Sequence, residues 1–342
     1  MRAYTDELCR RISERVGDAE EYRVDTVYLG GGTPSLLPEK CIEKIMNAVR
    51  EYDLSPHVEI TMECNPATAD ESYFYSVKNM GINRLSIGLQ SACDKELELL
   101  GRVHTKEDFV RCFSQARGAG FDNISVDLMY GIPDQTTESF ADSIEFLVST
   151  APEHISAYGL TVEEGTYFDK HRNELRLADD DTQAQMYCML DGILEDYGYH
   201  KYEISNFSKA GRESRHNMRY WQCLEYLGFG VAAHSFFAGE RFGNSRDIGA
   251  FIRGEDITEE RYRISDAEFR QEYVMLGLRL ARGIDTSEYR RKFGRGFYED
   301  YPCVSNYLRQ GFFCICGERI AFTEKGFLVS NGILSDMLDF SG

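Results

Sequence analysis

"VYLGGGTPSLLP", residues 27–38, places three glycines, a threonine and a proline directly behind an apolar run. The run at residues 24–29 is β-branched and aromatic, which predicts a buried strand. Glycine lets the main chain approach a ligand closely and leaves its N–H and C=O groups free to bind. The spacing matches neither the phosphate loop G-x-x-x-x-G-K-[ST] nor the dinucleotide fingerprint G-x-G-x-x-G. The stretch therefore predicts either a plain strand-to-helix turn or a ligand-binding turn of another kind.

Strands and helices alternate through the first half of the sequence. The apolar pattern predicts strands at residues 24–29, 57–66, 84–91, 123–133 and 154–166. Helical spacing lies between them, at residues 38–52, from residue 70, at 94–100 and 105–119, and at 136–150. No hairpin signal separates these strands, so we expect parallel strands joined by right-handed helical crossovers. Ligands of such α/β folds bind at the carboxyl ends of the strands.

Glycines and polar residues recur at those strand ends. They are Gly31, Gly32 and Thr33 after the first strand, then Glu63, Gln90, Asp127 and the step at residues 158–159 on the next four. Each position has a plain alternative as a rim carboxylate, a helix cap or a partner for a backbone amide. Their recurrence on successive strands favours one binding site along this edge of the sheet.

Four motifs follow one another in a specific order. They are GGGTP (30–34), MECNP (62–66), SIGLQS (86–91) and VDLMYGIP (126–133). With them the sequence resembles the oxygen-independent coproporphyrinogen oxidase family of radical S-adenosylmethionine proteins, over nearly the whole chain. The resemblance implies that the GGGTP backbone binds the methionine end of S-adenosylmethionine. The contacts that it implies are Gly31, Gly32, Thr33, Glu63, Gln90, Arg102 and Asp127. Carboxylate and amide oxygens suit the ligand's ammonium and hydroxyl groups, and an arginine suits its carboxylate.

A later stretch, "RHNMRYWQ" at residues 215–222, contains H-N-x-x-Y-W. This motif resembles the signature of the HemW-type haem chaperones within that family. Imidazole is a common axial ligand of haem iron, and aromatic rings can stack on a porphyrin, so His216, Tyr220 and Trp221 are haem candidates. The alternative is a surface or core histidine bonded to its neighbours. A second candidate ligand is His234.

One part of the family pattern is absent from the printed sequence. Radical S-adenosylmethionine proteins hold a [4Fe–4S] cluster with C-x₃-C-x₂-C, upstream of the glycine turn. Here Cys9 is the only cysteine before the turn, and it lies in an amphipathic helix that predicts a buried thiol. We therefore expect the first barrel strand and its cluster loop to be missing, and the metal ligands stay unknown. The C-x-C pair at Cys314 and Cys316 is an unusual spacing for a metal site.

Composition limits the class of protein. The 342 residues carry a net charge of −19, which argues against a general nucleic-acid binder. No apolar run reaches membrane-spanning length, and the N-terminus lacks a signal-peptide core, so we expect a cytoplasmic protein without stable membrane insertion. Residues 258–342 carry 12 Lys and Arg against 13 Asp and Glu, whereas the first 257 residues carry 26 against 44. This shift predicts a boundary near residue 258.

The C-terminal part has its own pattern. Residues 266–285 predict an amphipathic helix ended by Gly283, and further helices are expected at 286–293 and 301–310. Residues 312–338 predict a two-stranded wing that turns at residues 317–318, and a final helix. Three helices with a wing resemble a winged helix, and the family ends in this way. The near-balanced charge makes DNA binding the weaker interpretation, and a structural lid the stronger one.

Together these patterns predict a partial (β/α) barrel that lacks its first strand, followed by a small winged-helix-like domain. The expected divisions are residues 1–205 for the barrel, 206–257 for a connecting region with the H-N-x-x-Y-W motif, and 258–342 for the C-terminal domain. Residues 24–29 would form an exposed edge strand that promotes self-association.

The leading functional hypothesis is a HemW-like chaperone that binds haem and transfers it to an unidentified acceptor protein. The alternatives are an oxygen-independent coproporphyrinogen III oxidase, which decarboxylates its substrate by radical chemistry, and a degenerate relative that binds neither cofactor.

Overall fold

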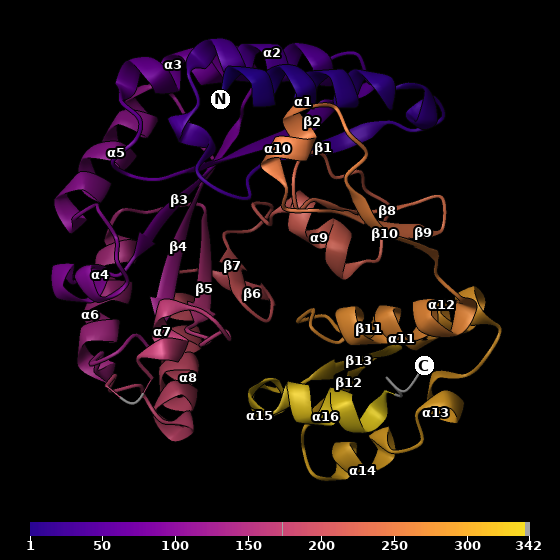
Figure 1. Cartoon of the computed structure of the whole chain (residues 1–342). Coiled ribbons are helices and arrows are strands. Elements are labelled where there is room, and N and C mark those ends of the chain that lie inside the picture. Colours follow the sequence, from indigo (N-terminus) through magenta and orange to yellow (C-terminus); the bar gives the residue numbers. More distant parts are fainter. Residues whose placement is uncertain (173, 339–342) are drawn as a thin grey trace. The chain divides into compact units, whose positions relative to one another are not determined.

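The computed structural model describes residues 1–172 and 174–338. The chain forms two compact units (Figure 1). The first unit comprises Met1–His200 and Ser205–Ser214, and the second comprises Lys201–Ile204 and the chain from Arg215 onward.

The first unit is built on a curled, half-barrel sheet. Within this unit the strands follow the order β1-β2-β3-β4-β5-β7, and the first five are parallel (Figure 1). The strands are β1 (Val24–Leu29), β2 (Leu54–Cys64), β3 (Arg84–Gln90), β4 (Ile124–Tyr130), β5 (His154–Gly159) and β7 (Asn206–Ser208). Strand β6 (His200–Glu203) belongs to the first unit only through His200. The five strands predicted from the sequence are confirmed, although the fifth ends at Gly159 and does not extend to residue 166. Strand β1 lies at one edge of the sheet.

The helices of this unit are α1 (Arg2–Glu14), α2 (Glu39–Val49), α3 (Glu71–Asn79), α4 (Asp94–Leu99), α5 (Lys106–Gly118), α6 (Thr137–Ser149), α7 (Tyr167–Lys170) and α8 (Asp180–Asp196). Those that join the parallel strands cover one face of the sheet, and α1, which precedes the first strand, packs against α2 (Figure 1). Hydrogen-bonding side chains fix where several of them begin. Thr105 caps α5 and Thr136 caps α6, each in a reciprocal capping box. The predicted α/β alternation is confirmed.

The two faces of this sheet differ in polarity. Side chains alternate between the faces, so every second residue packs under the helices. That face is apolar and almost fully buried; it includes Met62, Leu85, Ile87, Val126, Leu128 and Ile155. The other face carries polar side chains in register, including Thr61 beside Arg84, Ser86 beside Ser125, and Asp127 beside Ser156. Parallel sheets are usually apolar on both faces, so this polar face positions a candidate site.

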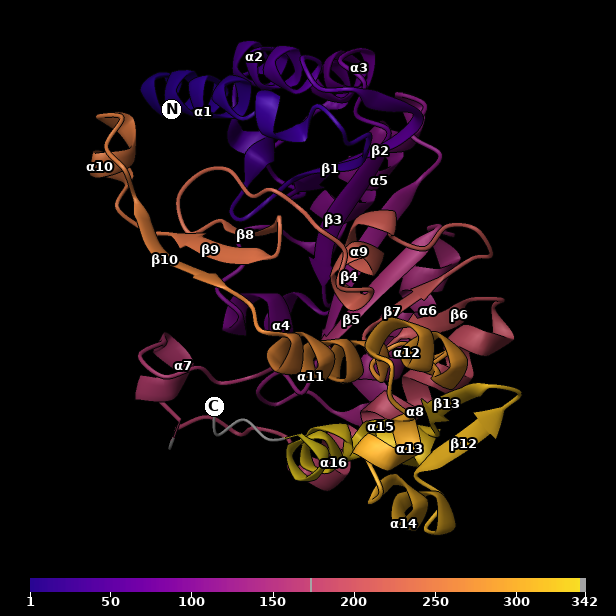
Figure 2. The ribbon, with the colours of Figure 1, turned by 90° about the vertical axis from the view of Figure 1, so that its right-hand side faces the viewer.

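The second unit begins with a short helix and an antiparallel sheet. The helix is α9 (Arg215–Trp221), and the sheet has the order β10-β9-β8 (Figure 2). Its strands are β8 (His234–Phe237), β9 (Glu240–Asn244) and β10 (Thr258–Arg263), with α10 (Ile248–Ile252) between the last two. The bridge between Tyr226 and Phe236 links this sheet to the segment that follows α9.

The C-terminal part of the second unit has the predicted winged-helix-like order. Its elements are α11 (Asp266–Gly277), β11 (Ile284–Asp285), α12 (Thr286–Phe293), α13 (Phe297–Asp300), α14 (Val304–Arg309), β12 (Phe313–Cys316), β13 (Arg319–Phe322), α15 (Glu324–Leu328) and α16 (Ser330–Met337). The predicted wing is β12 and β13, which meet at residues 317–318, and β11 adds a third strand to it.

One predicted helix is wrong in its length. The helix expected to end at Gly283 ends at Gly277. Residues 278–283 leave the helix because Leu280 bridges to Glu203 and Ile284 pairs with Ile320. Amphipathic spacing continued past Gly277, but strand pairing outweighed local propensity there.

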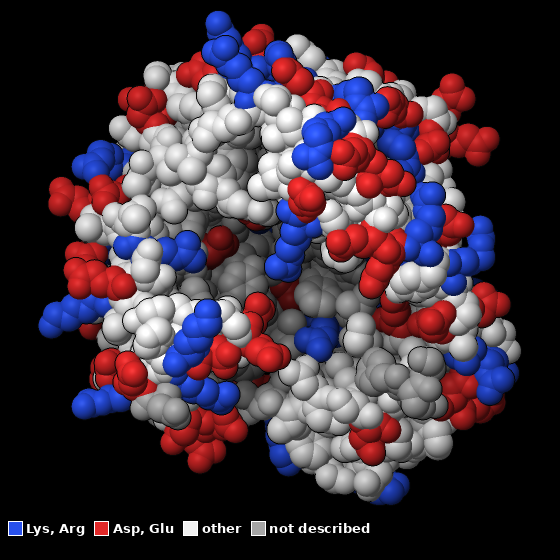
Figure 3. All heavy atoms as spheres, in the orientation of Figure 1, with Lys and Arg blue, Asp and Glu red and all other residues white. Residues whose placement is uncertain are grey.

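Two properties concern the chain as a whole. Within the described residues, no helix has the length and apolar character needed to span a membrane. Acidic and basic side chains are interspersed on the face shown in Figure 3, although the net charge is −19.

Candidate functional site

The glycine turn after β1 is tied to the carboxylate of Glu63. Gly31 has a φ of +81°, which favours glycine. Its N–H donates to Glu63 Oε2 at 3.2 Å, and the Tyr28 hydroxyl donates to Oε1 at 3.0 Å. A Cβ on Gly30 would lie 2.7 Å from Glu63 Oε1, so the turn can approach this carboxylate only with glycine there. The turn is thus a ligand-accessible main chain held against an acidic side chain.

A second carboxylate, Asp127, lies near the first. Ser86 Oγ donates to Asp127 Oδ1 at 3.1 Å. Burial and the charge of Glu63 raise the pKa of Asp127 to about 6, although bonds from Ser86 and Ser156 and the charge of Arg84 oppose the rise. Burial likewise raises the pKa of Glu63, against the hydrogen bonds of Tyr28 and the glycine turn. Two neighbouring carboxylates in a polar face form a site that favours a cationic ligand.

Gln90 has an unusual backbone at the end of β3. Its φ is +68°, it is 7% exposed, and the β3–β4 register shifts between Gly88 and Gln90. The side-chain amide folds back over Gly88, where a Cβ would lie 2.7 Å from Gln90 Nε2. A positive φ in a residue other than glycine is a strained conformation that clusters at functional sites.

The other residues predicted to contact the ligand show fewer links to Glu63 and Asp127. Arg102 is exposed in the loop between α4 and α5, and no hydrogen bond or ion pair links its side chain to the other candidates among the described residues. Its charge acts on His104, whose pKa is lowered chiefly by burial. Thr33 is half-buried directly before Pro34, and Tyr158 is 42% exposed at the end of β5. The structure therefore brings together Gly31, Gly32, Glu63 and Asp127, and shows no bond from the side chain of Thr33 or Arg102 to them among the described residues.

Sequence reasoning missed several polar residues on the same face. Tyr28, Ser86 and Ser156 bond to the two carboxylates. Thr61 Oγ1 and Arg84 Nε are buried without a hydrogen-bond partner in the described part of the chain. The signal that could have found these residues is the alternation of polar residues at positions 61, 63, 84, 86, 125, 127, 154 and 156.

In the second unit, α9 brings two of the three haem candidates together. His216 Nε2 lies 2.9 Å from the hydroxyl of Tyr220, one helical turn further on. The Tyr220 ring packs edge-on against Tyr226, with ring centroids 4.7 Å apart. Trp221 is half-buried five positions after His216, so it projects from a different side of the helix. Burial raises the pKa of Tyr220 to about 12, so its hydroxyl stays protonated.

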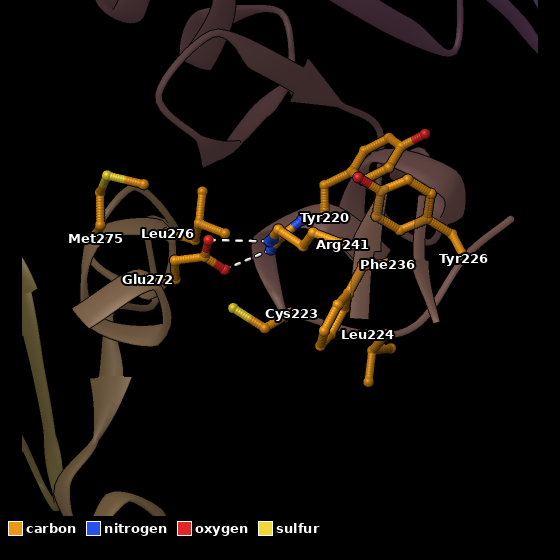
Figure 4. A pocket seen from close by; sticks show the side chains of 9 residues that line it. All are labelled: Tyr220, Cys223, Leu224, Tyr226, Phe236, Arg241, Glu272, Met275 and Leu276. Atoms are coloured by element: carbon orange, nitrogen blue, oxygen red, sulfur yellow. Dashed lines mark hydrogen bonds and ion pairs between the residues drawn. The ribbon is translucent and has the colours of Figure 1, made fainter. Parts of the chain in front are cut away.

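A cavity of about 350 Å³ lies beside this helix within the second unit (Figure 4). Its lining residues are Tyr220, Cys223, Leu224, Tyr226, Phe236, Arg241, Glu272, Met275 and Leu276. Most of these side chains are apolar or aromatic, which is typical of sites for small organic ligands. They come from α9, β8, β9, α11 and a loop, so no single sequence motif indicated the cavity.

An ion pair adds charge to this otherwise apolar cavity. Arg241 Nε donates to Glu272 Oε1 at 3.0 Å, and Nη2 bonds the second carboxylate oxygen (Figure 4). Burial opposes the charge of Arg241, but the hydrogen bond and charge of Glu272 raise its pKa above the ordinary value. His234, the second haem candidate, is exposed on β8 against Gly243 and is not among the lining residues.

The cysteines form no cluster-binding set. In residues 1–172 and 174–338, no group of three or more His, Cys, Asp or Glu side chains could hold a metal ion. Cys9, expected to be buried, is half-buried in α1, and Cys314 and Cys316 are exposed in β12. Cys64 and Cys112 lie close together, with 4.0 Å between their sulfur atoms. These residues therefore do not fit a [4Fe–4S] cluster.

Comparison with known proteins agrees with this architecture. The family model of the Radical SAM superfamily matches residues 1–147, and that of the HemN C-terminal domain matches residues 264–329. The solved structure described as coproporphyrinogen III oxidase (HemN) from Escherichia coli, a radical SAM enzyme, superimposes with a TM-score of 0.84 at 21% identity. The match covers 97% of this chain and 82% of that one. The predicted fold is confirmed.

Curated relatives are similar over nearly the full length. The protein named heme chaperone HemW from Bacillus subtilis is 33% identical, covering 98% of this chain and 91% of the relative. The heme chaperone HemW of Escherichia coli is 32% identical, with coverage of 97% and 88%. A mitochondrial radical S-adenosyl methionine domain-containing protein 1 from Mus musculus is 36% identical, with coverage of 77% and 63%. The chain belongs to the HemW family of the Radical SAM superfamily.

Proposed function

We propose that this chain is a haem chaperone, which binds haem through His216 and transfers it to an acceptor protein. The observation that carries the proposal is the His216–Tyr220 pair beside an open, largely apolar cavity. The likeness to relatives named heme chaperone HemW supports it. The coproporphyrinogen oxidase alternative rests on a structural likeness at 21% identity, which concerns the fold alone.

The side chains of α9 suit the chemistry of haem. His216 is half-buried, and the hydrogen bond that occupies its Nε2 is to a hydroxyl group that iron can replace. Tyr220 exposes 39% of its surface and offers an aromatic face near the imidazole. An axial ligand with adjacent apolar walls binds haem tightly enough to carry it, while partial exposure leaves the cargo accessible to an acceptor.

A haem titration tests this proposal. Adding haem to the purified full-length chain should shift the Soret band to that of a histidine complex. His216→Ala should weaken binding by at least about tenfold, equivalent to about 1.4 kcal/mol. The matched control is His234→Ala, which removes an exposed imidazole from the same unit and should leave the titration unchanged.

Two results would count against the proposal. An unshifted Soret band in the unmodified chain would favour the degenerate relative that binds no cofactor. An unchanged titration of His216→Ala would move the haem site away from α9.

We also propose that the polar face of the first unit binds S-adenosylmethionine. The ligand carries a sulfonium and an ammonium group, which suit the carboxylates of Glu63 and Asp127. The main chain of Gly31 and Gly32 and the amide of Gln90 add polar groups, and we include Thr33 and Arg102 among the proposed contacts. The orphaned Thr61 Oγ1 and Arg84 Nε fit a face completed by a polar ligand.

The residues that suit S-adenosylmethionine do not include ligands for the iron–sulfur cluster of the superfamily. In the superfamily, S-adenosylmethionine bound to a [4Fe–4S] cluster supplies a 5′-deoxyadenosyl radical, but the described residues do not fit such a cluster. Without the cluster, S-adenosylmethionine lacks its contact with iron. Loss of one charge-assisted contact costs about 2–5 kcal/mol, so we expect this chain to bind S-adenosylmethionine in roughly the millimolar range.

We place the protein in the cytoplasm, where its ten free thiols would stay reduced.

A further inference from the structure

The Arg241–Glu272 pair is an unusual wall for an apolar cavity. Arg241 comes from β9 and Glu272 from α11, and their side chains point toward one another (Figure 4). The guanidinium also lies 4.7 Å from the ring centroid of Phe236. The two side chains are 21% and 26% exposed, so solvent can reach the pair.

The geometry of this pair shows which ligand group Arg241 is built to hold. Two guanidinium nitrogens face two carboxylate oxygens in a bidentate arrangement, which is specific for planar anions. Stacking on Phe236 fixes the plane of the guanidinium. Any second carboxylate that reached the cavity would find the same fork already oriented.

The remaining walls suit the edge of a flat apolar molecule. Tyr220, Tyr226, Phe236, Leu224, Met275 and Leu276 surround a volume of about 350 Å³. This volume is near the lower end for sites of small organic ligands, so it accommodates part of a porphyrin and not the whole. Haem has both of its propionate carboxylates on one edge. Tyr220 is shared by the cavity and the hydrogen bond to His216.

We propose that this cavity receives the propionate edge of haem, and that Arg241 exchanges the carboxylate of Glu272 for a propionate. The inference rests on the proposed haem function and adds the orientation of the cargo. The exchange replaces one carboxylate by another, so the charge beside the guanidinium is unchanged.

Glu272 provides a way for Arg241 to release a bound propionate. Its carboxylate is partly exposed, so it can turn to solvent when a propionate binds and return when haem leaves. An internal competitor weakens retention of the cargo without altering the iron ligand. This property suits a protein that must give haem up.

The test compares haem with haem dimethyl ester, in which both propionates are neutral. The unmodified chain should bind haem about 10- to 100-fold more tightly than the ester, toward the low end for a charge pair because solvent reaches Arg241. Arg241→Gln should lose most of that preference while still binding the ester. Glu272→Gln should tighten haem binding about 3- to 10-fold, because it removes the competing carboxylate.

A matched control is Arg261→Gln. Arg261 lies on the neighbouring strand β10, with its guanidinium 4.7 Å from the ring of Phe242 and 3.5 Å from Glu240, but it does not line the cavity. It should keep the full preference for haem over the ester. Melting curves of all variants separate loss of folding from loss of the preference.

The outcomes distinguish this inference from the function on which it rests. Equal affinity of the unmodified chain for haem and its ester overturns the propionate site while leaving haem binding intact. An undiminished preference in folded Arg241→Gln, or weaker haem binding by folded Glu272→Gln, also overturns it. If the unmodified chain binds neither compound, the haem function fails, and the propionate site fails with it.

Discussion

Glu63 and Asp127 show how single side chains prepare the polar face for a cation. Burial raises the pKa of both carboxylates, and the charge of Glu63 raises that of Asp127 further. A cationic ligand between the two carboxylates would reduce the repulsion between their negative charges. The polar face thus carries an electrostatic cost that binding would offset.

This arrangement predicts that binding of S-adenosylmethionine depends on pH. The pKa of Asp127 is about 6, so the carboxylate is mostly protonated at pH 5 and ionised at pH 7. The cationic groups and the hydroxyl groups of S-adenosylmethionine bind the ionised carboxylate of Asp127 more strongly than its protonated form. Affinity measured by calorimetry should therefore rise about tenfold from pH 5 to pH 7. Asp127→Asn should bind more weakly at pH 7 and lose most of this dependence. Parallel pH profiles of the two proteins would contradict the assignment.

At the scale of residues, strand-end positions were predictable and the network between them was not. Glu63, Gln90 and Asp127 stood out because parallel strands place their carboxyl ends at one edge. Tyr28 lies inside an apolar run, and nothing in that run indicated its bond to Glu63. The positive φ of Gln90 depends on the register shift against β4, which is a property of the paired strands.

At the scale of elements, local signals placed most helices and strands, and tertiary pairing corrected them. Capping residues and strand–helix alternation are local, and they predicted the order of β1 to β5. The end of α11 depended on a strand pair with Ile320, far along the sequence. The edge position of β1 is confirmed, and the self-association expected from it stays a prediction.

The turn that leads into β11 allows a sharp test of the second unit. Gly283 has a φ of +59°, and a Cβ there would lie 1.9 Å from the carbonyl oxygen of Ile320. Gly283→Ala should cost about 2–5 kcal/mol, because a left-handed conformation and a backbone clash add together. Calorimetry should show the loss as a lower melting temperature.

Gly294 supplies the control for this substitution. Its φ is +69°, and a Cβ added there would meet no described atom within 4 Å. Gly294→Ala should therefore cost only the conformational part, about 1–2 kcal/mol. Equal melting temperatures of the two variants would contradict the close packing of this turn against β13.

At the scale of the whole molecule, the chain combines two candidate sites of different chemistry. The first unit offers an acidic polar face, and the second offers an aromatic cavity with one bidentate ion pair. The H-N-x-x-Y-W motif indicated the neighbourhood of the second site from sequence. Its cavity could not be predicted, because α9, β9 and α11 come together only in the folded unit.

The central claim is that His216 is the iron ligand of a bound haem. The most direct measurement is resonance Raman and electron paramagnetic resonance spectroscopy of the haem-loaded full-length chain. We predict about one haem per chain with imidazole ligation, which persists in His234→Ala and is lost in His216→Ala. Unchanged imidazole ligation in a folded His216→Ala protein would contradict the account.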